Sequence, residues 1–266
     1  MPTLTRLFLA LFVFLLAACS PAAPSEPPAA LTILSAASLN EAFTDLGRQF
    51  EAANPGVTLT FNFAGSQALA QQLVQGAPAD VFASANNQQM AAAVQAGRVA
   101  DDAPQVFATN ELVLITPSGN PAGLKALTDL ARPGLKLVFA DPSVPAGQYS
   151  LDFLDKAEQN PAFGVGFRAA VLQNVVSYEE SVRAVLTKVS LGEADAGIVY
   201  RSDTSGRAAS GVAPIEIPPA LNVRARYPIA AISDSANPAL AQAFIDFVLS
   251  PSGQETLSRY GFLPNE

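Results

Sequence analysis

Along the chain, segments with apolar runs or strand-like alternation are followed by segments whose apolar residues recur every three to four positions. This pattern predicts strands that alternate with helices. Residues 31–34 form a short apolar run between small residues, as expected of a buried strand. Residues 38–53 carry apolar side chains at helical spacing, and the Ser-x-x-Glu pattern of Ser38 and Glu41 predicts that this helix begins at Ser38. Strand-like alternation returns over residues 57–63, so the chain starts with a strand–helix–strand unit.

The same alternation continues toward the C-terminus. Further helices are predicted at residues 67–75, 88–96, 124–131, 146–157, 181–189, 238–249 and 251–259. Further strands are predicted at residues 79–83, 111–116, 136–140, 171–176, 196–200 and 226–232. Strands that alternate with helices indicate largely parallel sheets covered by helices, so the predicted fold class is α/β.

Two stretches rich in Pro and small residues divide this pattern. Residues 117–121 mark a first crossing between lobes, and residues 211–219 a return crossing. The prediction is one lobe of residues 31–115 with 214–266 and a second of residues 116–213, each a mixed sheet flanked by helices. Two α/β lobes joined by two crossings leave a cleft, which is where such folds place ligands.

The N-terminal segment has the pattern of a secretion signal. Residues 1–18 contain no acidic group and an apolar run too short to span a membrane. That run ends in Leu-Ala-Ala-Cys, which resembles the lipobox of bacterial lipoproteins, so Cys19 is expected to become the lipidated first residue. Residues 19–30, rich in Pro and Ala, are expected to form a flexible tether. We therefore expect an extracytoplasmic, lipid-anchored protein; the alternative is an ordinary signal peptide with an incidental cysteine.

Composition excludes several kinds of chemistry. The 266 residues include no histidine and one cysteine, so Ser-His-Asp catalysis, Cys-His catalysis and His-ligated metal sites are all excluded. The formal net charge is −8, and removal of residues 1–18 with Arg6 makes the chain more acidic still, which argues against a nucleic-acid partner. An enzyme would need a cluster of carboxylates or lysines at the cleft, and none is evident. We expect no enzymatic activity, no cofactor and a monomer.

Seven short segments, in order along the chain, carry a resemblance to a known family. They are Ser-Ala-Ala-Ser-Leu at 35–39, Phe-Ala-Gly-Ser at 63–66, Gly-Ala-Pro-Ala-Asp-Val-Phe-Ala-Ser at 76–84, Asp-Pro-Ser-Val-Pro-Ala-Gly at 141–147, Glu-Ser-Val-Arg at 180–183, Gly-Ile-Val-Tyr at 197–200 and Arg-Tyr-Gly-Phe at 259–262. With them, residues 31–262 resemble the molybdate-binding proteins of ABC importers. The resemblance implies the two-lobed (type II) fold of periplasmic binding proteins, with molybdate or tungstate as ligand and an ABC permease with its ATPase as partners.

The resemblance also implies which residues hold the oxyanion, namely neutral donors from both lobes without direct bonds from protein to metal. The family's motifs carry over onto the hydroxyls of Ser38 and Ser66, the backbone amides of Ala146 and Val182, and the phenol of Tyr200. Some relatives are rich in serine around the second of these positions, where this chain has a glycine and a glutamine. The conformation of that loop therefore does not follow from the resemblance.

Physical chemistry supports part of this set independently. Ser38, Ser66 and Ala146 each stand at the start of a predicted helix, and Val182 lies in the first turn of another. The free N–H groups and the dipole of a helix N-terminus favour an anion. Taken singly, each serine would pass for an ordinary helix cap and Tyr200 for a packing residue.

The protonation state of the ligand narrows the choice further. Molybdate and tungstate are fully deprotonated near neutral pH, so a cage made only of donors satisfies every oxygen. Monohydrogen phosphate carries a proton that needs an acceptor, and leaving that proton unpaired costs about 1–3 kcal/mol. Sulfate is also an acceptor-only dianion, so only its shorter bonds could exclude it.

Several alternatives remain open at this point. Asp80 is expected to cap loop amides, but it would favour phosphate if it pointed into the cleft, and Arg183 is expected to face solvent or pair with Glu179 or Glu180. A binding protein for sulfate or phosphate is one alternative function. A lipid-anchored oxyanion sensor is another, and only measurements of uptake would separate it from a transport protein.

Overall fold

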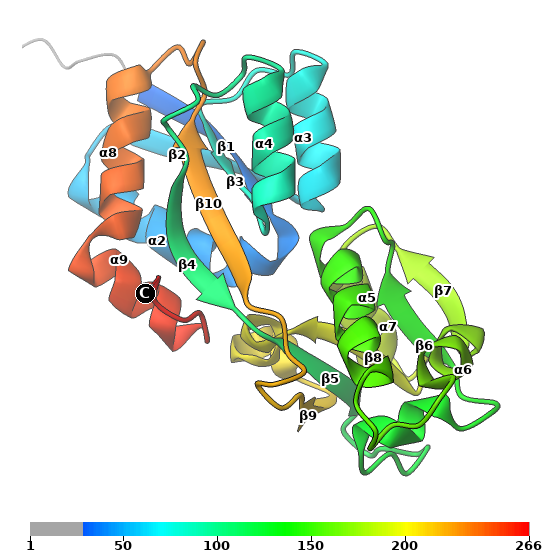
Figure 1. The fold of residues 1–266 in the computed structure, drawn as a ribbon. Coiled ribbons are helices and arrows are strands. Elements are labelled where there is room, and N and C mark those ends of the chain that lie inside the picture. Colours follow the sequence, from blue (N-terminus) through cyan, green and yellow to red (C-terminus); the bar gives the residue numbers. More distant parts are fainter. Residues whose placement is uncertain (1–28, 266) are drawn as a thin grey trace, which may run out of the picture.

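Two five-stranded sheets organise residues 29–265, the part of the chain that the computed structural model describes (Figure 1). The predicted signal, Cys19 and the predicted tether up to residue 28 lie outside these residues. Residues 29–30 were also predicted as tether, but they belong to strand β1 (Ala29–Ala36), because they pair with residues 57–58 of the neighbouring strand. Within residues 29–265, no helix is both long and apolar enough to span a membrane.

Lobe 1 is built on the sheet with strand order β2-β1-β3-β10-β4. Its strands are β1 (Ala29–Ala36), β2 (Val57–Ala64), β3 (Val81–Ala83), β4 (Gln105–Asn110) and β10 (Ala225–Ala231). The first strand runs parallel to β2 and β3, whereas β10 runs antiparallel to β3 and β4. The sheet is therefore mixed, and the carboxyl ends of β1 and β3 share one edge.

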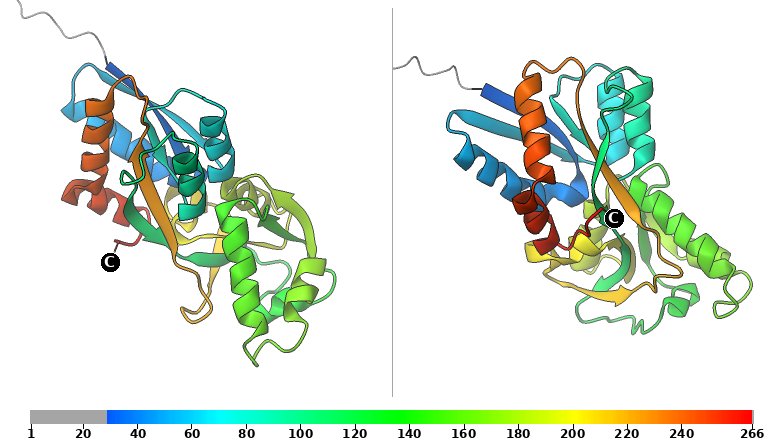
Figure 2. Two further views of the ribbon diagram at one scale, coloured as in Figure 1. Left: turned by 45° about the horizontal axis from the view of Figure 1, so that its top comes forward. Right: turned by 60° about the vertical axis from the view of Figure 1, so that its left-hand side comes forward.

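Five helices cover the two faces of the lobe 1 sheet, as the views in Figure 2 show. They are α2 (Asn40–Ala53), α3 (Ser66–Val74), α4 (Asn87–Gln95), α8 (Pro238–Leu249) and α9 (Pro251–Arg259). On one face α3 and α4 bury a small cluster around Leu69, Phe82 and Met90. On the other face α2 and α8 meet through aromatic rings, with the centroids of Phe50 and Phe244 5.4 Å apart. Both faces are thus shielded from water, as a sheet with parallel strands requires.

Lobe 2 repeats this plan with strand order β7-β6-β8-β5-β9. Its strands are β5 (Leu112–Pro117), β6 (Leu137–Ala140), β7 (Val175–Glu179), β8 (Ala196–Tyr200) and β9 (Val212–Glu216). Its helices are α5 (Pro145–Glu158), α6 (Phe167–Gln173) and α7 (Val182–Ser190), with short 3-10 turns η3 (Leu127–Ala131), η4 (Arg201–Thr204) and η5 (Gly206–Ala209). Strand β6 is parallel to β7 and β8, whereas β5 is antiparallel to β8 and β9, so this sheet is mixed as well.

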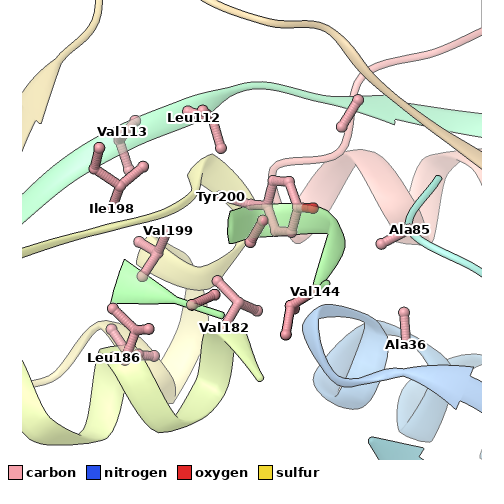
Figure 3. Close-up of a cluster of buried hydrophobic side chains, with 14 of the residues drawn as sticks. Ala36, Ala85, Leu112, Val113, Val144, Val182, Leu186, Ile198, Val199 and Tyr200 are labelled. Atoms are coloured by element: carbon pink, nitrogen blue, oxygen red, sulfur yellow. The ribbon is translucent and has the colours of Figure 1, made fainter. Parts of the chain in front are cut away.

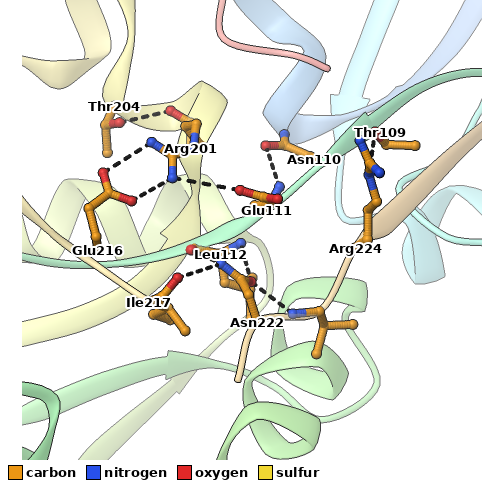
Figure 4. A network of polar contacts seen from close by, with 11 residues as sticks. Thr109, Asn110, Glu111, Leu112, Arg201, Thr204, Glu216, Ile217, Asn222 and Arg224 are labelled. Carbon is orange, nitrogen blue, oxygen red and sulfur yellow. Dashed lines mark hydrogen bonds and ion pairs between the residues drawn. The ribbon is translucent and has the colours of Figure 1, made fainter. Parts of the chain in front are cut away.

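The chain crosses between the lobes twice, and hydrogen bonds join the two crossings (Figure 4). The first crossing is Glu111, between β4 and β5, and the second runs through residues 217–224. The side chain of Asn222 accepts from the Leu112 N–H (2.9 Å) and donates to the Leu112 carbonyl (2.9 Å) and to the Ile217 carbonyl (3.2 Å). An asparagine side chain thus replaces the strand pairing that is lost where the chain leaves one sheet for the other.

Several predicted elements differ from the structure. Ser38 does not cap a helix: a 3-10 turn, η2 (Ala37–Leu39), precedes α2, and neither has a side-chain cap. Residues 171–176 are the end of α6 and the start of β7 rather than one strand, and residues 124–131 contain only a 3-10 turn. Strand β4 was not predicted. In each case tertiary packing decided between patterns that local spacing leaves ambiguous.

The lobe boundaries also lie a few residues from the predicted positions. Positions 115/116 and 213/214 fall inside β5 and β9, and both strands pair within the lobe 2 sheet. The return crossing predicted at 211–219 is largely strand β9. Pro and small residues were misleading there, because β9 is an edge strand, where proline is tolerated.

Replacing Asn222 by alanine is expected to destabilise the protein by about 2–3 kcal/mol, because the buried N–H and C=O of Leu112 would lose their partner. Urea unfolding of the variant measures this loss. Asn62→Ala, which removes an exposed hydrogen bond on β2, is the matched control and should change stability by less than about 0.5 kcal/mol. Equal stabilities of the two variants would show that the crossings do not depend on Asn222.

Candidate functional site

A small pocket lies between the lobes at the carboxyl ends of β1 and β8. The residues that line it are Ala36, Ala37, Ser38, Gly65, Ser66, Ala85, Val144, Pro145, Ala146, Val182 and Tyr200. Its cavity volume is about 10 Å³, far below the roughly 300–1,000 Å³ typical of sites for drug-sized molecules. The pocket therefore suits a small, compact ligand held by both lobes.

Three helices begin at this pocket. Ser66 is the first residue of α3, Ala146 the second residue of α5 and Val182 the first residue of α7. The N–H groups in the first turn of a helix have no carbonyl partner within that helix. Together with the helix dipoles, they make each of these N-termini a place where negative charge is favoured.

Both serine hydroxyls of the pocket are buried and hydrogen-bonded on their inner side. The Ala85 N–H donates to Ser66 Oγ over 3.0 Å, and Ser38 Oγ lies 2.9 Å from Tyr227 Oη. Ser66 is 1% exposed and Ser38 7% exposed. Because the Ala85 amide can only donate, the Ser66 hydroxyl proton is left free to point into the pocket.

The Tyr200 hydroxyl is a buried donor at the pocket. The side chain is 1% exposed, yet its oxygen has no hydrogen-bond partner among the residues that the structure describes. In Figure 3 this oxygen extends from lobe 2 toward the side where Ala36 and Ala85 of lobe 1 lie. Burial raises the pKa of Tyr200 well above its usual value, so the phenol stays protonated and can donate. A buried hydroxyl without a partner is costly unless a ligand accepts its proton.

All five residues implied by the family resemblance, Ser38, Ser66, Ala146, Val182 and Tyr200, therefore line one pocket. No charged side chain joins them in the lining. Residues 29–265 contain neither His nor Cys, and they contain no cluster of three or more acidic residues that could hold a metal ion. What the pocket offers is a set of neutral donors, which fits an anion that only accepts hydrogen bonds.

The two charged residues left open by the sequence are both engaged elsewhere. Asp80 accepts from the Thr32 N–H (2.7 Å) and the Ser235 hydroxyl (2.5 Å), so it fastens β1 to the loop after β10. Arg183 pairs with Asp203, 3.7 Å away, rather than with Glu179 or Glu180. The site consequently has neither the carboxylate that a protonated phosphate would need nor an arginine clamp.

Asp203 lies directly behind the site and supports it. One carboxylate oxygen accepts from the backbone N–H of Tyr200 (3.1 Å), and the other faces Arg183 at the start of α7. Asp203 is 0% exposed, and burial raises its pKa from 3.8 to about 6, although Arg183 acts in the opposite direction. This ion pair links the strand that ends in Tyr200 to the helix that presents the Val182 amide.

The closed arrangement of the lobes involves residues that the sequence patterns did not single out. Gln67 Nε2 donates to the Glu180 carbonyl across the cleft (3.0 Å), and Asn110 Nδ2 donates to Ser202 Oγ near the first crossing (2.8 Å). A Cβ at Gly65 would stand 2.5 Å from the same Glu180 carbonyl, so glycine permits this approach. The glycine and glutamine beside Ser66 thus serve lobe contact, a role that no local spacing reveals.

Comparisons with known proteins agree with this geometry. Residues 31–263 match the family model described as bacterial extracellular solute-binding protein. Molybdate-binding protein ModA of Mycobacterium tuberculosis is 43% identical over 245 residues, which cover 92% of this chain and 88% of that protein.

Two solved structures share the fold at lower identity. The sulfate-binding protein SubI from Mycobacterium tuberculosis matches with a TM-score of 0.80 at 21% identity, over 90% of this chain and 88% of that one. The periplasmic molybdate-binding protein of Azotobacter vinelandii matches with a TM-score of 0.76 at 20% identity, over 89% of this chain and 100% of that one. The two-lobed α/β fold predicted for this chain is thereby confirmed.

The raised pKa of Asp203 makes a prediction about stability and pH. Because the folded state holds this proton more tightly than the unfolded state, the group stabilises the fold at pH 4 and loses that contribution as the pH rises through about 6. Asp203→Asn has no such proton, so its stability relative to the wild type should rise by about 2–3 kcal/mol between pH 4 and pH 7. Urea unfolding of both proteins across this range measures the difference, and the other carboxyl groups cancel. Parallel stability curves would contradict the assignment.

Proposed function

This chain belongs to the bacterial extracellular solute-binding proteins, and within them to the molybdate-binding proteins of ABC importers, and we propose that it captures molybdate in the pocket between its lobes. Tungstate, with the same charge and the same tetrahedral shape, is proposed as a second ligand. The protein performs no chemistry on the anion. It acts as a monomer that delivers the bound anion to a membrane permease driven by an ATPase.

The observation that carries the proposal is a buried pocket in which hydroxyl and amide donors converge without any charged side chain. A fully deprotonated tetrahedral dianion accepts from every donor and returns no proton to the site. Three helix N-termini and the Tyr200 phenol together provide such donors. No arginine or lysine lines the pocket, so release of the anion does not require a strong ion pair to break.

Ligand binding and lobe closure depend on each other in this arrangement. Ser38 and Ser66 belong to lobe 1, whereas Ala146, Val182 and Tyr200 belong to lobe 2. Because neither lobe alone surrounds the pocket, the ligand binds most tightly to the closed form and shifts the lobes toward it. Closure around the anion is the signal that we propose a permease recognises.

Sulfate is the alternative that the donor set does not exclude. It is an acceptor-only dianion too, and discrimination against it depends on the distances between donors in the closed pocket. Phosphate is disfavoured for a separate reason, because Asp80 is engaged by Thr32 and Ser235 and lies outside the pocket lining.

Calorimetric titration of the purified mature protein with molybdate, tungstate, sulfate and phosphate tests the proposal. The first two anions are expected to bind tightly, and Ser38→Ala or Ser66→Ala should each weaken binding roughly 10-fold to 100-fold, because each removes a hydrogen bond to a charged ligand. Ser258→Ala, at an exposed position on α9, is the control and should bind like the wild type. Tight binding of sulfate or phosphate alone would overturn the ligand, and no binding of any anion would overturn the function.

Lipid anchoring through Cys19 is proposed on the Leu-Ala-Ala-Cys sequence that ends the apolar run. Cells that express the full chain should incorporate labelled palmitate into it and keep it in the membrane fraction. Cys19→Ser should abolish the labelling and release the protein from membranes, since it removes the thiol that would carry the lipid. Membrane retention of an unlabelled Cys19→Ser protein would contradict the proposal.

A further inference from the structure

The glycine and glutamine on either side of Ser66 are not among the proposed ligand donors, yet they form a contact between the lobes. Gln67 is the second residue of α3, and its Nε2 donates to the Glu180 carbonyl over 3.0 Å. Glu180 belongs to lobe 2, directly before Ser181, the N-cap of α7, and two residues before Val182. A lobe 1 side chain is thereby fastened to the backbone that leads into one of the helices at the pocket.

Gly65 makes room for this contact. Its φ of −58° is open to any residue, so the backbone conformation does not require glycine here. The requirement is steric: a Cβ would stand 2.5 Å from the Glu180 carbonyl oxygen and 2.5 and 2.6 Å from the two polar atoms of the Gln67 amide. Glycine and glutamine are therefore a matched pair, because the bare Cα admits both the amide and the carbonyl that it binds.

Lobe 1 places a second glutamine in the same relation to lobe 2. Gln89, in the first turn of α4, donates from Nε2 to the Ser143 carbonyl over 3.5 Å, which is long for a hydrogen bond. Ser143 lies three residues before Ala146 at the start of α5, and Asp141 Oδ1 accepts from its N–H and its hydroxyl over 2.9 and 2.6 Å. Each of the two lobe 2 amides proposed as ligands thus has a lobe 1 glutamine bound to the backbone just before it.

Neither glutamine is part of the pocket lining, so both act on the lobes rather than on the ligand. The bond from Gln67 to Glu180 is exposed to water, and Gln67 Oε1 is enclosed without a hydrogen-bond partner among the residues that the structure describes. Competition from water weakens the bond, and the unpaired acceptor offsets part of what it contributes. The contact is therefore too weak to close the lobes unaided, and it adds to the stability of a form that a ligand has already closed.

We propose that Gln67, assisted by Gln89, is a positioning residue that holds the closed lobes together and sets how slowly the anion leaves. The inference rests on the proposed function and extends it to the rate of release. Binding begins at the open form, in which the Gln67 amide and the Glu180 carbonyl are apart, so the bond does not affect association. Release requires the lobes to separate, and the bond must break for that to happen.

Replacing Gln67 by methionine removes the donor but keeps the length and helix propensity of the side chain. In Gln67→Met the dissociation rate constant of molybdate is expected to rise roughly 3-fold to 10-fold, since one neutral hydrogen bond of the closed form is lost. The association rate constant should not change. The ratio of the affinities for tungstate and molybdate should not change either, because Gln67 contacts neither anion. Gln89→Met should act in the same direction with a smaller effect, because its hydrogen bond is longer.

Release of radioactive molybdate from the mature protein into excess unlabelled molybdate gives the dissociation rate constant. Calorimetry gives the dissociation constant, and the quotient of the two gives the association rate constant. Gln71→Met is the matched control, because Gln71 is an exposed glutamine one turn further along α3, and it should release molybdate like the wild type. In a Gly65→Ala background, Gln67→Met should accelerate release no further, because the added Cβ already separates the amide from the Glu180 carbonyl.

The outcomes separate this inference from the proposed function. A wild type that binds no molybdate defeats the function, whereas a wild type that binds it and a Gln67→Met protein that releases it at the wild-type rate defeat only the role of Gln67. Slower association with unchanged release, or an altered ratio of tungstate to molybdate affinity, would show that the substitution distorts the donors themselves and would overturn the proposal too. Equal acceleration in Gln71→Met would do the same, and wild-type release from Gln89→Met would overturn the part assigned to Gln89.

Discussion

The convergence of three helix N-termini on one buried space is the constraint on which the rest of this structure depends. Each of α3, α5 and α7 follows a strand of its own sheet, and each must begin at the edge that faces the other lobe. Parallel strand pairs make this possible, because their carboxyl ends share an edge. The charge of a ligand can then be balanced by amides and hydroxyls whose positions are set by whole secondary-structure elements rather than by mobile side chains.

The two crossings between the sheets turn this geometry into a hinge. Asn222 binds both polar groups of Leu112, and Arg201 joins Glu111 of the first crossing to Glu216 at the end of β9 (Figure 4). Tyr200 and Tyr227, which end up in contact beside the hinge, belong to different lobes. The same region thus holds the lobes together and places donors at the ligand, so that closing the lobes and completing the site are one event.

Much of this organisation could be predicted from local pattern. The apolar run that became β1, the helical spacing of α2 and the start of α3 at Ser66 all follow from periodicity and breakers. The family's motifs identified Ser38, Ser66, Ala146, Val182 and Tyr200 as one set, although 162 positions separate the first of them from the last (200 − 38). The capping role of Ser38 was wrong because its hydroxyl finds a better partner, Tyr227, which is 189 positions away.

The sequence by itself determined the α/β class, most elements, the two-lobed plan and the chemical character of the site, because these depend on periodicity, residue type and short motifs. Only the tertiary structure decided that Asp80 and Arg183 are engaged outside the pocket, that Gly65 admits the Glu180 carbonyl, and that Tyr227 stands behind Ser38. These relations join residues far apart in the chain, and a hydrogen bond or a close approach depends on distances that no local spacing encodes.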